Sequence, residues 1–272
     1  TLTQVTEEKV AEYRDNRLKK VTPGTVVREL RMLSHIFSTA RREWGFGDIN
    51  NPVANITKPR EPEGRCPSLT EIQLDRLLAE CKNASTEYLF PFVLLALHTG
   101  CRSGELRRLK WSQVDLEKGY IHLSGKDTKS HRRRSVKLTH PAVTTLKEMA
   151  NNSKMLDMHG MPTGLIFPAK GKPDQPRDMH MAFNRAVKRA GLDNLPGEGK
   201  LRTHDLRHIH STHLIIFGAD LETTRKSLGH RDLSTTQRYL HVANSHPQEV
   251  IDKMGRLGMG DTEKTLSKKS EP

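Results

Sequence analysis

Residues 88–99 read YLFPFVLLALHT, an almost unbroken apolar run in a chain of 272 residues of which 28% are charged. The run is well short of the roughly 18 apolar residues that a membrane span needs. Its length and composition are typical of a helix buried in a protein core. Gly100 follows directly and suits the left-handed residue that ends many helices. We therefore expect this helix at the centre of a mainly helical domain.

The sequence around this run predicts further helices and a few short strands. Ser68-x-x-Glu71 has the spacing of a capping box ahead of a helix over 69–80. Alternation of apolar and polar residues predicts short strands, at 119–124, 134–138 and 165–167. Helical spacing predicts further helices, at 139–151, 177–190, 204–217, 220–228 and 234–243. The expected fold class is mainly α with a small antiparallel sheet (α+β).

A separate helical segment precedes this domain. Its pattern is clearest over 23–45, where Pro23 suits a first helical turn and apolar residues recur at spacings of three and four. Residues 51–67 (NPVANITKPREPEGRCP) are rich in proline and have no apolar period, which is typical of a linker. The chain is thus expected to divide into a helical domain (1–57), a linker (58–67), a second domain (68–245) and a C-terminal segment with a tail (246–272). Because the chain begins with Thr1, we expect the first domain to be truncated.

The chain carries 45 Lys and Arg against 32 Asp and Glu, a formal net charge of +13. Such an excess indicates a polyanionic partner, most often nucleic acid. Basic residues gather in the turn before the 134–138 strand and on the 23–45 helix, where they either contact DNA or are simply solvated. The candidate DNA-contacting residues are Lys126, Arg132, Arg133, Arg134, Arg28, Arg31 and Arg41. No secretory signal or membrane segment is recognisable, so a cytoplasmic protein with no membrane partner is expected.

Three motifs place reactive side chains in the second domain, namely HTGCRSGEL at 98–106, THDLRH at 203–208 and LGHRDLSTTQRYLH at 228–241. In the motif at 98–106, Arg102 follows directly after the buried helix. A guanidinium at the end of a buried helix is costly unless an anion is close by, and Glu105 could be that anion. In the second, His204 and Arg207 share a helix face. Arg207 could bind phosphate oxygens there while the imidazole donates or moves a proton.

The third motif contains Tyr239, on a polar helix between basic residues. A phenol has a pKa near 10, so a nucleophilic tyrosine needs cations or a base close by. The pair His204 and His208 has the spacing of two metal ligands, but Arg207 on the same turn disfavours a cation there. No P-loop and no nucleophile elbow is present. Neither a metal nor a cofactor is expected.

In this order, the motifs resemble the tyrosine recombinase family, also called the phage integrase family, over roughly 68–245. The resemblance implies a catalytic domain there and a helical core-binding DNA domain before it. It also implies that Arg102 and Arg207 hold the two non-bridging oxygens of the scissile phosphate. Tyr239 would then attack phosphorus and form a 3′-phosphotyrosyl link.

Further roles follow from the same resemblance. His204 would assist proton movement at the nucleophile, His230 would hydrogen-bond the phosphate, and Glu105 would position the site. A lysine in the basic hairpin would protonate the departing 5′-oxygen. Aligning TKSHRRRSVKL with the family's usual T-K-x-G-K-x-R-x-V-P-L selects Lys129. Lys126 stays an alternative, because this chain has His and Lys where the pattern has Gly and Pro.

The function implied is a site-specific DNA recombinase that cleaves and rejoins strands through a Holliday junction, without metal or ATP. Integration, excision and inversion remain open as outcomes. The expected partners are double-stranded DNA with a recombination site, a homotetramer on synapsed sites, and accessory DNA-bending proteins, in the nucleoid of a bacterium or phage host. We expect the basic hairpin and the 23–45 helix on opposite sides of a duplex, and residues 245–260 against a neighbouring subunit. The alternatives are a type IB-like topoisomerase and a catalytically silent DNA-binding regulator.

Overall fold

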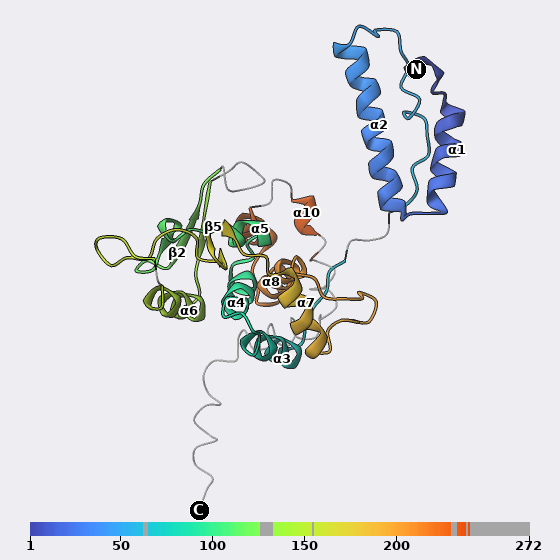
Figure 1. The fold of residues 1–272 in the computed structure, drawn as a ribbon. Coiled ribbons are helices and arrows are strands. Elements are labelled where there is room, and N and C mark those ends of the chain that lie inside the picture. The colour runs from blue at the N-terminus through green and yellow to red at the C-terminus, as the bar shows by residue number, and fades with distance from the viewer. Residues whose placement is uncertain (62–64, 126–132, 154, 230–232, 238, 240–272) are drawn as a thin grey trace, which may run out of the picture. The chain divides into compact units, whose positions relative to one another are not determined.

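The computed structural model describes residues 1–61, 65–125, 133–153, 155–229, 233–237 and 239 (Figure 1). The chain divides into two compact units, Thr1–Gly64 and Arg65–Pro272. Each unit has its own cluster of buried apolar side chains. The two are described separately below.

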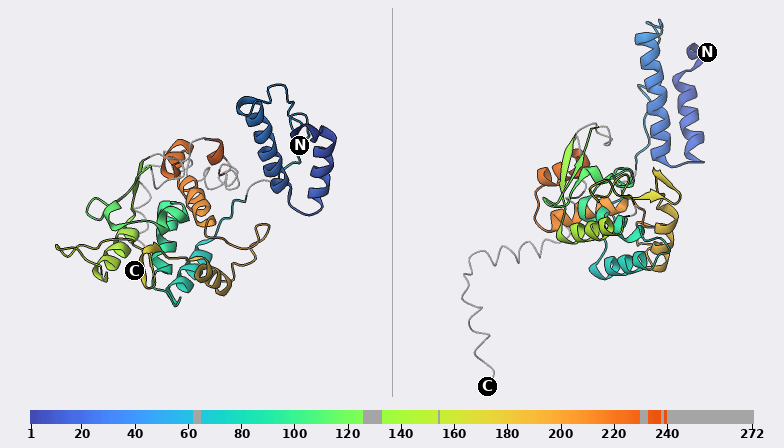
Figure 2. Two further views of the ribbon diagram at one scale, coloured as in Figure 1. Left: turned by 45° about the horizontal axis from the view of Figure 1, so that its top comes forward. Right: turned by 60° about the vertical axis from the view of Figure 1, so that its left-hand side comes forward.

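The first unit is a pair of helices, α1 (Glu7–Leu18) and α2 (Pro23–Glu43), which follow a short 3₁₀ turn, η1 (Leu2–Gln4). Figure 2 shows the two helices side by side in both views. The Thr6 hydroxyl accepts a hydrogen bond from the backbone N–H of Lys9 at the start of α1, a standard N-cap. Pro23 lies in the first turn of α2, as predicted. The core of the unit is formed by Val10, Val26, Leu30 and Val53.

The apolar run forms α4 (Leu89–Thr99), and the prediction of a buried helix is confirmed. It is surrounded by α3 (Glu71–Lys82), α5 (Ser103–Arg107), α6 (His140–Asn151) and α8 (Asp205–Ile216), as Figure 1 shows. A further helix, α7 (His180–Arg189), packs on α3. Gly100 ends α4 with a φ of 60°, the left-handed conformation that its sequence position predicts.

The cap of α3 differs from the prediction. The capping box is formed by Thr70 and Gln73 rather than by Ser68 and Glu71. The Thr70 hydroxyl accepts from the Gln73 N–H, and the Gln73 side chain accepts from the Thr70 N–H at 2.9 Å. Both pairs have the required spacing, so the position at which the helix starts decides between them.

Short antiparallel strands complete the second unit. A three-stranded sheet has the order β1 (Val114–Asp115), β2 (Tyr120–Leu123), β3 (Arg134–Lys137), and a second sheet pairs β4 (Pro168–Ala169) with β5 (Lys172–Pro176). The 3₁₀ turn η2 (Trp111–Gln113) precedes β1. The expected strand at 165–167 is wrong, because Leu165 forms an isolated bridge with Lys110 and the strand starts at Pro168. The fold class, mainly α with small antiparallel sheets, is confirmed.

Two helices follow α8 near the end of the described chain. The first, α9 (Leu221–Leu228), begins at Asp220, whose carboxylate accepts from the Thr223 N–H at 2.7 Å, and ends at Gly229 with a φ of 65°. The second, α10 (Ser234–Gln237), packs on α9. It covers the first part of the helix expected over 234–243, and the remainder, apart from Tyr239, lies outside the described residues.

Candidate active site

The first part of the site is built where α4 ends and α5 begins. Gly100 turns the chain, and Arg102 becomes the N-cap residue of α5. The Glu105 carboxylate accepts hydrogen bonds from the Arg102 backbone N–H at 2.9 Å and from Arg102 Nη1 at 3.0 Å. The Glu105 side chain is 2% exposed, whereas that of Arg102 is 24% exposed. Glu105 therefore holds Arg102 in place while leaving part of the Arg102 side chain accessible.

A second arginine reaches the same carboxylate from the three-stranded sheet. Arg134, on β3, donates Nη2 to Glu105 Oε2 at 2.6 Å and Nη1 to Oε1 at 3.2 Å. Burial by itself would raise the pKa of Glu105, but the hydrogen bonds and charge of Arg134, with the bonds from Arg102, hold the pKa below its ordinary value. Glu105 is therefore ionised at neutral pH and joins α5 to β3.

Arg207, on α8, completes a group of three guanidiniums. It donates Nη1 to the Gly100 carbonyl and Nη2 to the Leu228 carbonyl, each at 2.7 Å. Burial, followed by the positive charges of Arg102 and Arg134, lowers the pKa of Arg207 to about 10, so it is still protonated at neutral pH. Because Arg102 and Arg134 share Glu105 and Arg207 bonds the carbonyl two residues before Arg102, the three arginines gather where α4 ends.

The charges in this cluster do not cancel. In the described part of the chain, the cluster contains three guanidiniums, those of Arg102, Arg134 and Arg207. The carboxylate that lies among them is that of Glu105. Arg207 donates to the carbonyl oxygens of Gly100 and Leu228, which carry only partial negative charge. A buried positive excess of this kind favours an anion, and guanidiniums bind phosphate oxygens in pairs.

Tyr239 joins this cluster through His208, the residue after Arg207 on α8. The Tyr239 phenol oxygen lies 2.7 Å from His208 Nδ1. The His208 ring in turn meets the His204 ring edge-on, with 5.2 Å between centroids. His204, at the N-cap of α8, is exposed, whereas Tyr239 is 1% exposed. The structure thus brings His204 and Tyr239 to either side of His208.

Close packing beneath the turn explains why Gly100 is needed. A Cβ at this position would lie 2.4 Å from Cδ2 of His210. His210 is buried on α8, about one helical turn after Arg207. His210 is held by a 2.8 Å hydrogen bond between Nδ1 and the Leu97 carbonyl. Burial lowers the pKa of His210 to about 4, so it is neutral and packs as an uncharged ring.

Four of the sequence candidates lie outside the described residues, namely Lys126, Lys129, Arg132 and His230. Arg133 is described and exposed. On α2, Arg28, Arg31 and Arg41 are exposed, with Arg28 donating to the Gly24 carbonyl and Arg31 paired with Glu61 at 3.0 Å. Arg134 differs from these surface arginines, because its side chain is 10% exposed and bonded to Glu105.

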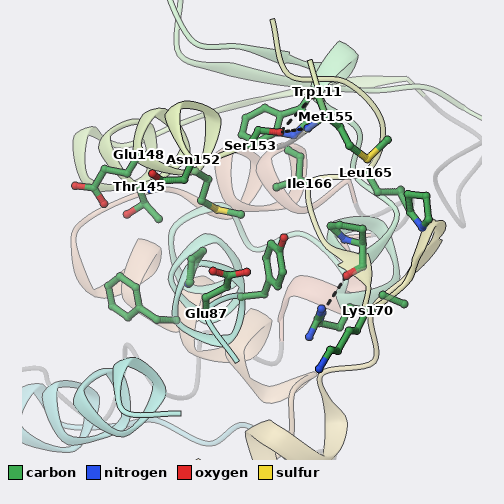
Figure 3. Close-up of a pocket in the computed structure, with 18 of the residues that line it drawn as sticks. Glu87, Trp111, Thr145, Glu148, Asn152, Ser153, Met155, Leu165, Ile166 and Lys170 are labelled. Atoms are coloured by element: carbon green, nitrogen blue, oxygen red, sulfur yellow. Dashed lines mark hydrogen bonds between the residues drawn. The ribbon is translucent and has the colours of Figure 1, made fainter. Parts of the chain in front are cut away.

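A cavity of about 620 Å³ lies elsewhere in the second unit (Figure 3). Its wall includes Trp111, Leu165 and Ile166, and residues at the start of α4 and on α6. Arg177 lies over the Tyr88 ring there, 4.7 Å from the ring centroid. The lining contains no arginine of the cluster and no Tyr239, so we do not assign this cavity to the site.

The described residues contain no group of three or more His, Cys, Asp or Glu that could hold a metal ion. In the same part of the chain, no helix is long and apolar enough to cross a membrane.

Residues 67–246 match the model of the phage integrase family. The chain belongs to this family. It is 33% identical to the tyrosine recombinase XerD of Shewanella oneidensis, over 74% of this chain and 65% of XerD. It is 31% identical to a putative integrase of Pseudomonas phage Pf1, over 87% of this chain and 63% of that protein. The integrase-family chain thus spans less than two thirds of these relatives' length.

Solved structures share the fold. The integrase of transposon Tn1549, in complex with a circular intermediate DNA, has a TM-score of 0.70 at 18% identity, covering 91% of this chain and 86% of that one. A λ integrase dimer bound to a COC′ core site has a TM-score of 0.68 at 21% identity, covering 88% and 80%. Both matches extend over most of this integrase-family chain.

Sequence reasoning missed two members of the site. His208 was considered as a metal ligand beside His204, and its contact with Tyr239 was not foreseen. Arg134 was assigned to a DNA-facing hairpin. A signal for its inward direction exists in the sequence, because alternate residues of a strand share a face and Val136, two residues on, is apolar and buried.

Proposed function

We propose that this phage integrase family chain is a site-specific DNA recombinase that breaks and rejoins strands through Tyr239. The observation that carries the proposal is the gathering of three parts at the end of α4. Arg102 is bonded to Glu105, Arg207 is bonded to the Gly100 carbonyl two residues before Arg102, and Tyr239 is held by the residue next to Arg207. A positive site for one phosphate beside a single phenol is what attack on a phosphodiester requires.

In the proposed reaction, Arg102 and Arg207 bind the two non-bridging oxygens of the scissile phosphate. The Tyr239 oxygen attacks phosphorus, a 3′-phosphotyrosyl bond forms, and the bond to the 5′-oxygen breaks. Lys129, or Lys126, protonates the leaving oxygen, and His230 hydrogen-bonds the phosphate. The guanidiniums stabilise the charge that develops on the equatorial oxygens. The covalent bond conserves the energy of the broken phosphodiester, so rejoining uses no ATP.

The proposed assembly is a homotetramer on two synapsed duplex sites, exchanging strands through a Holliday junction. Named relatives support a DNA partner, because the Tn1549 and λ integrases were each solved with DNA. A 31% identical relative over 88% of this chain is a shufflon-specific DNA recombinase of Escherichia coli, of which 58% is covered. It supports inversion as one outcome, beside integration and excision. In this proposal the protein acts at the nucleoid of its cell, with accessory DNA-bending proteins as partners.

The test is covalent trapping on a nicked suicide duplex, in which the short cleaved strand diffuses away and leaves the protein attached. The substrates are duplexes from the DNA that flanks the gene. We expect an adduct with the wild type and with Tyr88→Phe, a matched control far from the arginine cluster, and none with Tyr239→Phe. An adduct that persists in Tyr239→Phe overturns the assignment of the nucleophile.

Two further outcomes address the alternatives. Relaxation of a supercoiled plasmid without a recombination site would favour a topoisomerase. Tight duplex binding with no adduct on any flanking duplex would favour a catalytically silent regulator. A recombinase is expected to form an adduct on its own site and to leave the plasmid supercoiled.

A further inference from the structure

A nucleophilic phenol must lose its proton as the bond to phosphorus forms. The pKa of a free phenol is near 10, so water at neutral pH is a poor acceptor for it. Tyr239 is 1% exposed, which keeps bulk water away from the ring. The proton therefore needs an acceptor within the protein.

His208 lies where such an acceptor is needed. Its Nδ1 atom is 2.7 Å from the phenol oxygen, within the range of a hydrogen bond to a catalytic base. The residue is half-buried on α8, one position after the buried Arg207, so a rigid helix fixes the imidazole relative to the arginine cluster. A neutral imidazole has one nitrogen with a lone pair, and the tautomer with hydrogen on Nε2 presents that lone pair to the phenol.

The neighbouring imidazole has a different position. His204 is exposed and contacts the His208 ring edge-on, at 5.2 Å between centroids. His208 lies between the His204 ring and the phenol, and its Nδ1 is within hydrogen-bond distance of the phenol oxygen.

We propose that His208 is the general base for Tyr239, an inference that rests on the recombinase function proposed above. As the phenol oxygen bonds to phosphorus, its proton passes to His208 Nδ1 and the bond from phosphorus to the 5′-oxygen breaks. The 5′-oxygen takes its proton from the hairpin lysine. In rejoining, a 5′-hydroxyl displaces the tyrosine, and the His208 imidazolium returns the proton to the departing phenolate.

The experiment measures single-turnover cleavage of the suicide duplex by His208→Asn. Asparagine places an amide close to the position of Nδ1, so it can still hydrogen-bond the phenol but cannot accept its proton. General base catalysis is worth about 10²–10⁴ in rate, and we expect a loss in that range. His159→Asn, an exposed histidine in the loop after α6, is the matched control and should cleave at the wild-type rate.

Two chemical changes separate a base from a structural residue. Replacing Tyr239 by a difluorinated tyrosine, whose phenol ionises near neutral pH, should restore most of the rate lost in His208→Asn. Replacing the 5′-bridging oxygen of the substrate by sulfur, which leaves without a proton, should restore none of it. His208→Gln is measured in parallel, with thermal unfolding and duplex binding as checks that each variant is folded.

The results that overturn the inference are distinct from failure of the proposed function. No adduct with the wild type refutes the recombinase and, with it, the base. A normal wild-type adduct with undiminished cleavage by folded His208→Asn refutes the base alone. A cleavage defect of His208→Asn that difluorotyrosine at position 239 does not repair would assign His208 another role. A defect that the sulfur-containing substrate repairs would do the same.

Discussion

Replacing Glu105 by glutamine tests the buried cluster most directly. The carboxylate is 2% exposed and accepts from Arg102 and from both terminal nitrogens of Arg134. Removing one partner of a buried ion pair costs about 3–5 kcal/mol, because the remaining charges stay buried without compensation. Glutamine keeps one carbonyl oxygen as an acceptor, so we expect a value near the lower end, about 3 kcal/mol.

That loss converts into a measurable change. For a domain of this size, each kcal/mol shifts the thermal midpoint by about 2–4 °C, so Glu105→Gln should lower it by about 6–12 °C. Calorimetry at neutral pH and low salt measures the shift. The matched control is Glu222→Gln on α9, which removes a carboxylate paired with Arg225 at 2.7 Å but 49% exposed. An exposed pair of this kind contributes little or nothing measurable.

The comparison has a clear refuting result. Equal midpoints for the Glu105→Gln and Glu222→Gln variants would show that the arginine cluster does not depend on the Glu105 charge. A selective fall for Glu105→Gln, together with slower adduct formation on the suicide duplex, is the expected pattern. It would follow because Arg102 and Arg134 lose the group that orients them.

Three stability predictions and one on binding follow from the same contacts. Gly100→Ala should lower the midpoint of thermal unfolding more than Gly171→Ala does. Both glycines have positive φ (60° and 71°), but a Cβ at Gly100 would meet His210, whereas a Cβ at Gly171 would meet nothing within 4 Å. Equal losses in the two variants would contradict this packing. Inorganic phosphate at constant ionic strength should raise the midpoint more than chloride does, because an anion bound at Arg207 stabilises the folded state, and equal effects would argue against an anion site. The pKa of Glu105 lies below its ordinary value of 4.5. The contribution of Glu105 to the free energy of unfolding is therefore complete above that value and is lost as the pH falls through the folded-state pKa. In urea titrations between about pH 5 and pH 3, the wild type should lose more stability than Glu105→Gln. Duplex binding should weaken steeply as salt rises, since phosphate contacts release counterions, and a flat response in a filter-binding titration would count against a DNA partner.

The helices were largely predictable because their apolar spacing is a local property. The run that forms α4 and the pattern of α2 identify buried faces without knowledge of their neighbours. The pair β4–β5 was not predictable in this way. Lys172–Pro176 reads KPDQP, with no apolar alternation and four exposed residues, so its strand conformation depends on pairing with β4 rather than on a buried face.

The site was predictable where motifs carry it and less so where distant segments meet. Arg102, Glu105 and Arg207 were found from short motifs. The inward direction of Arg134 depends on the pairing of β3 with β2 and on Glu105, far away in the sequence. The contact between His208 and Tyr239 depends on the path of the chain from α8 through α9 to α10, which periodicity does not reveal.

The anchoring of Arg207 has a consequence for reading mutational kinetics. Its two carbonyl partners are at the ends of α4 and α9, and the second lies a short stretch of chain before Tyr239. Such carbonyls have no partner within their own helices. Lysine at 207 keeps a positive charge but has no planar fork with which to bridge the two helix ends. In the proposed reaction, a slow Arg207→Lys variant would therefore reflect both a loosened attachment of the segment that carries Tyr239 and weaker binding of phosphate. Its rate constant would combine the two losses.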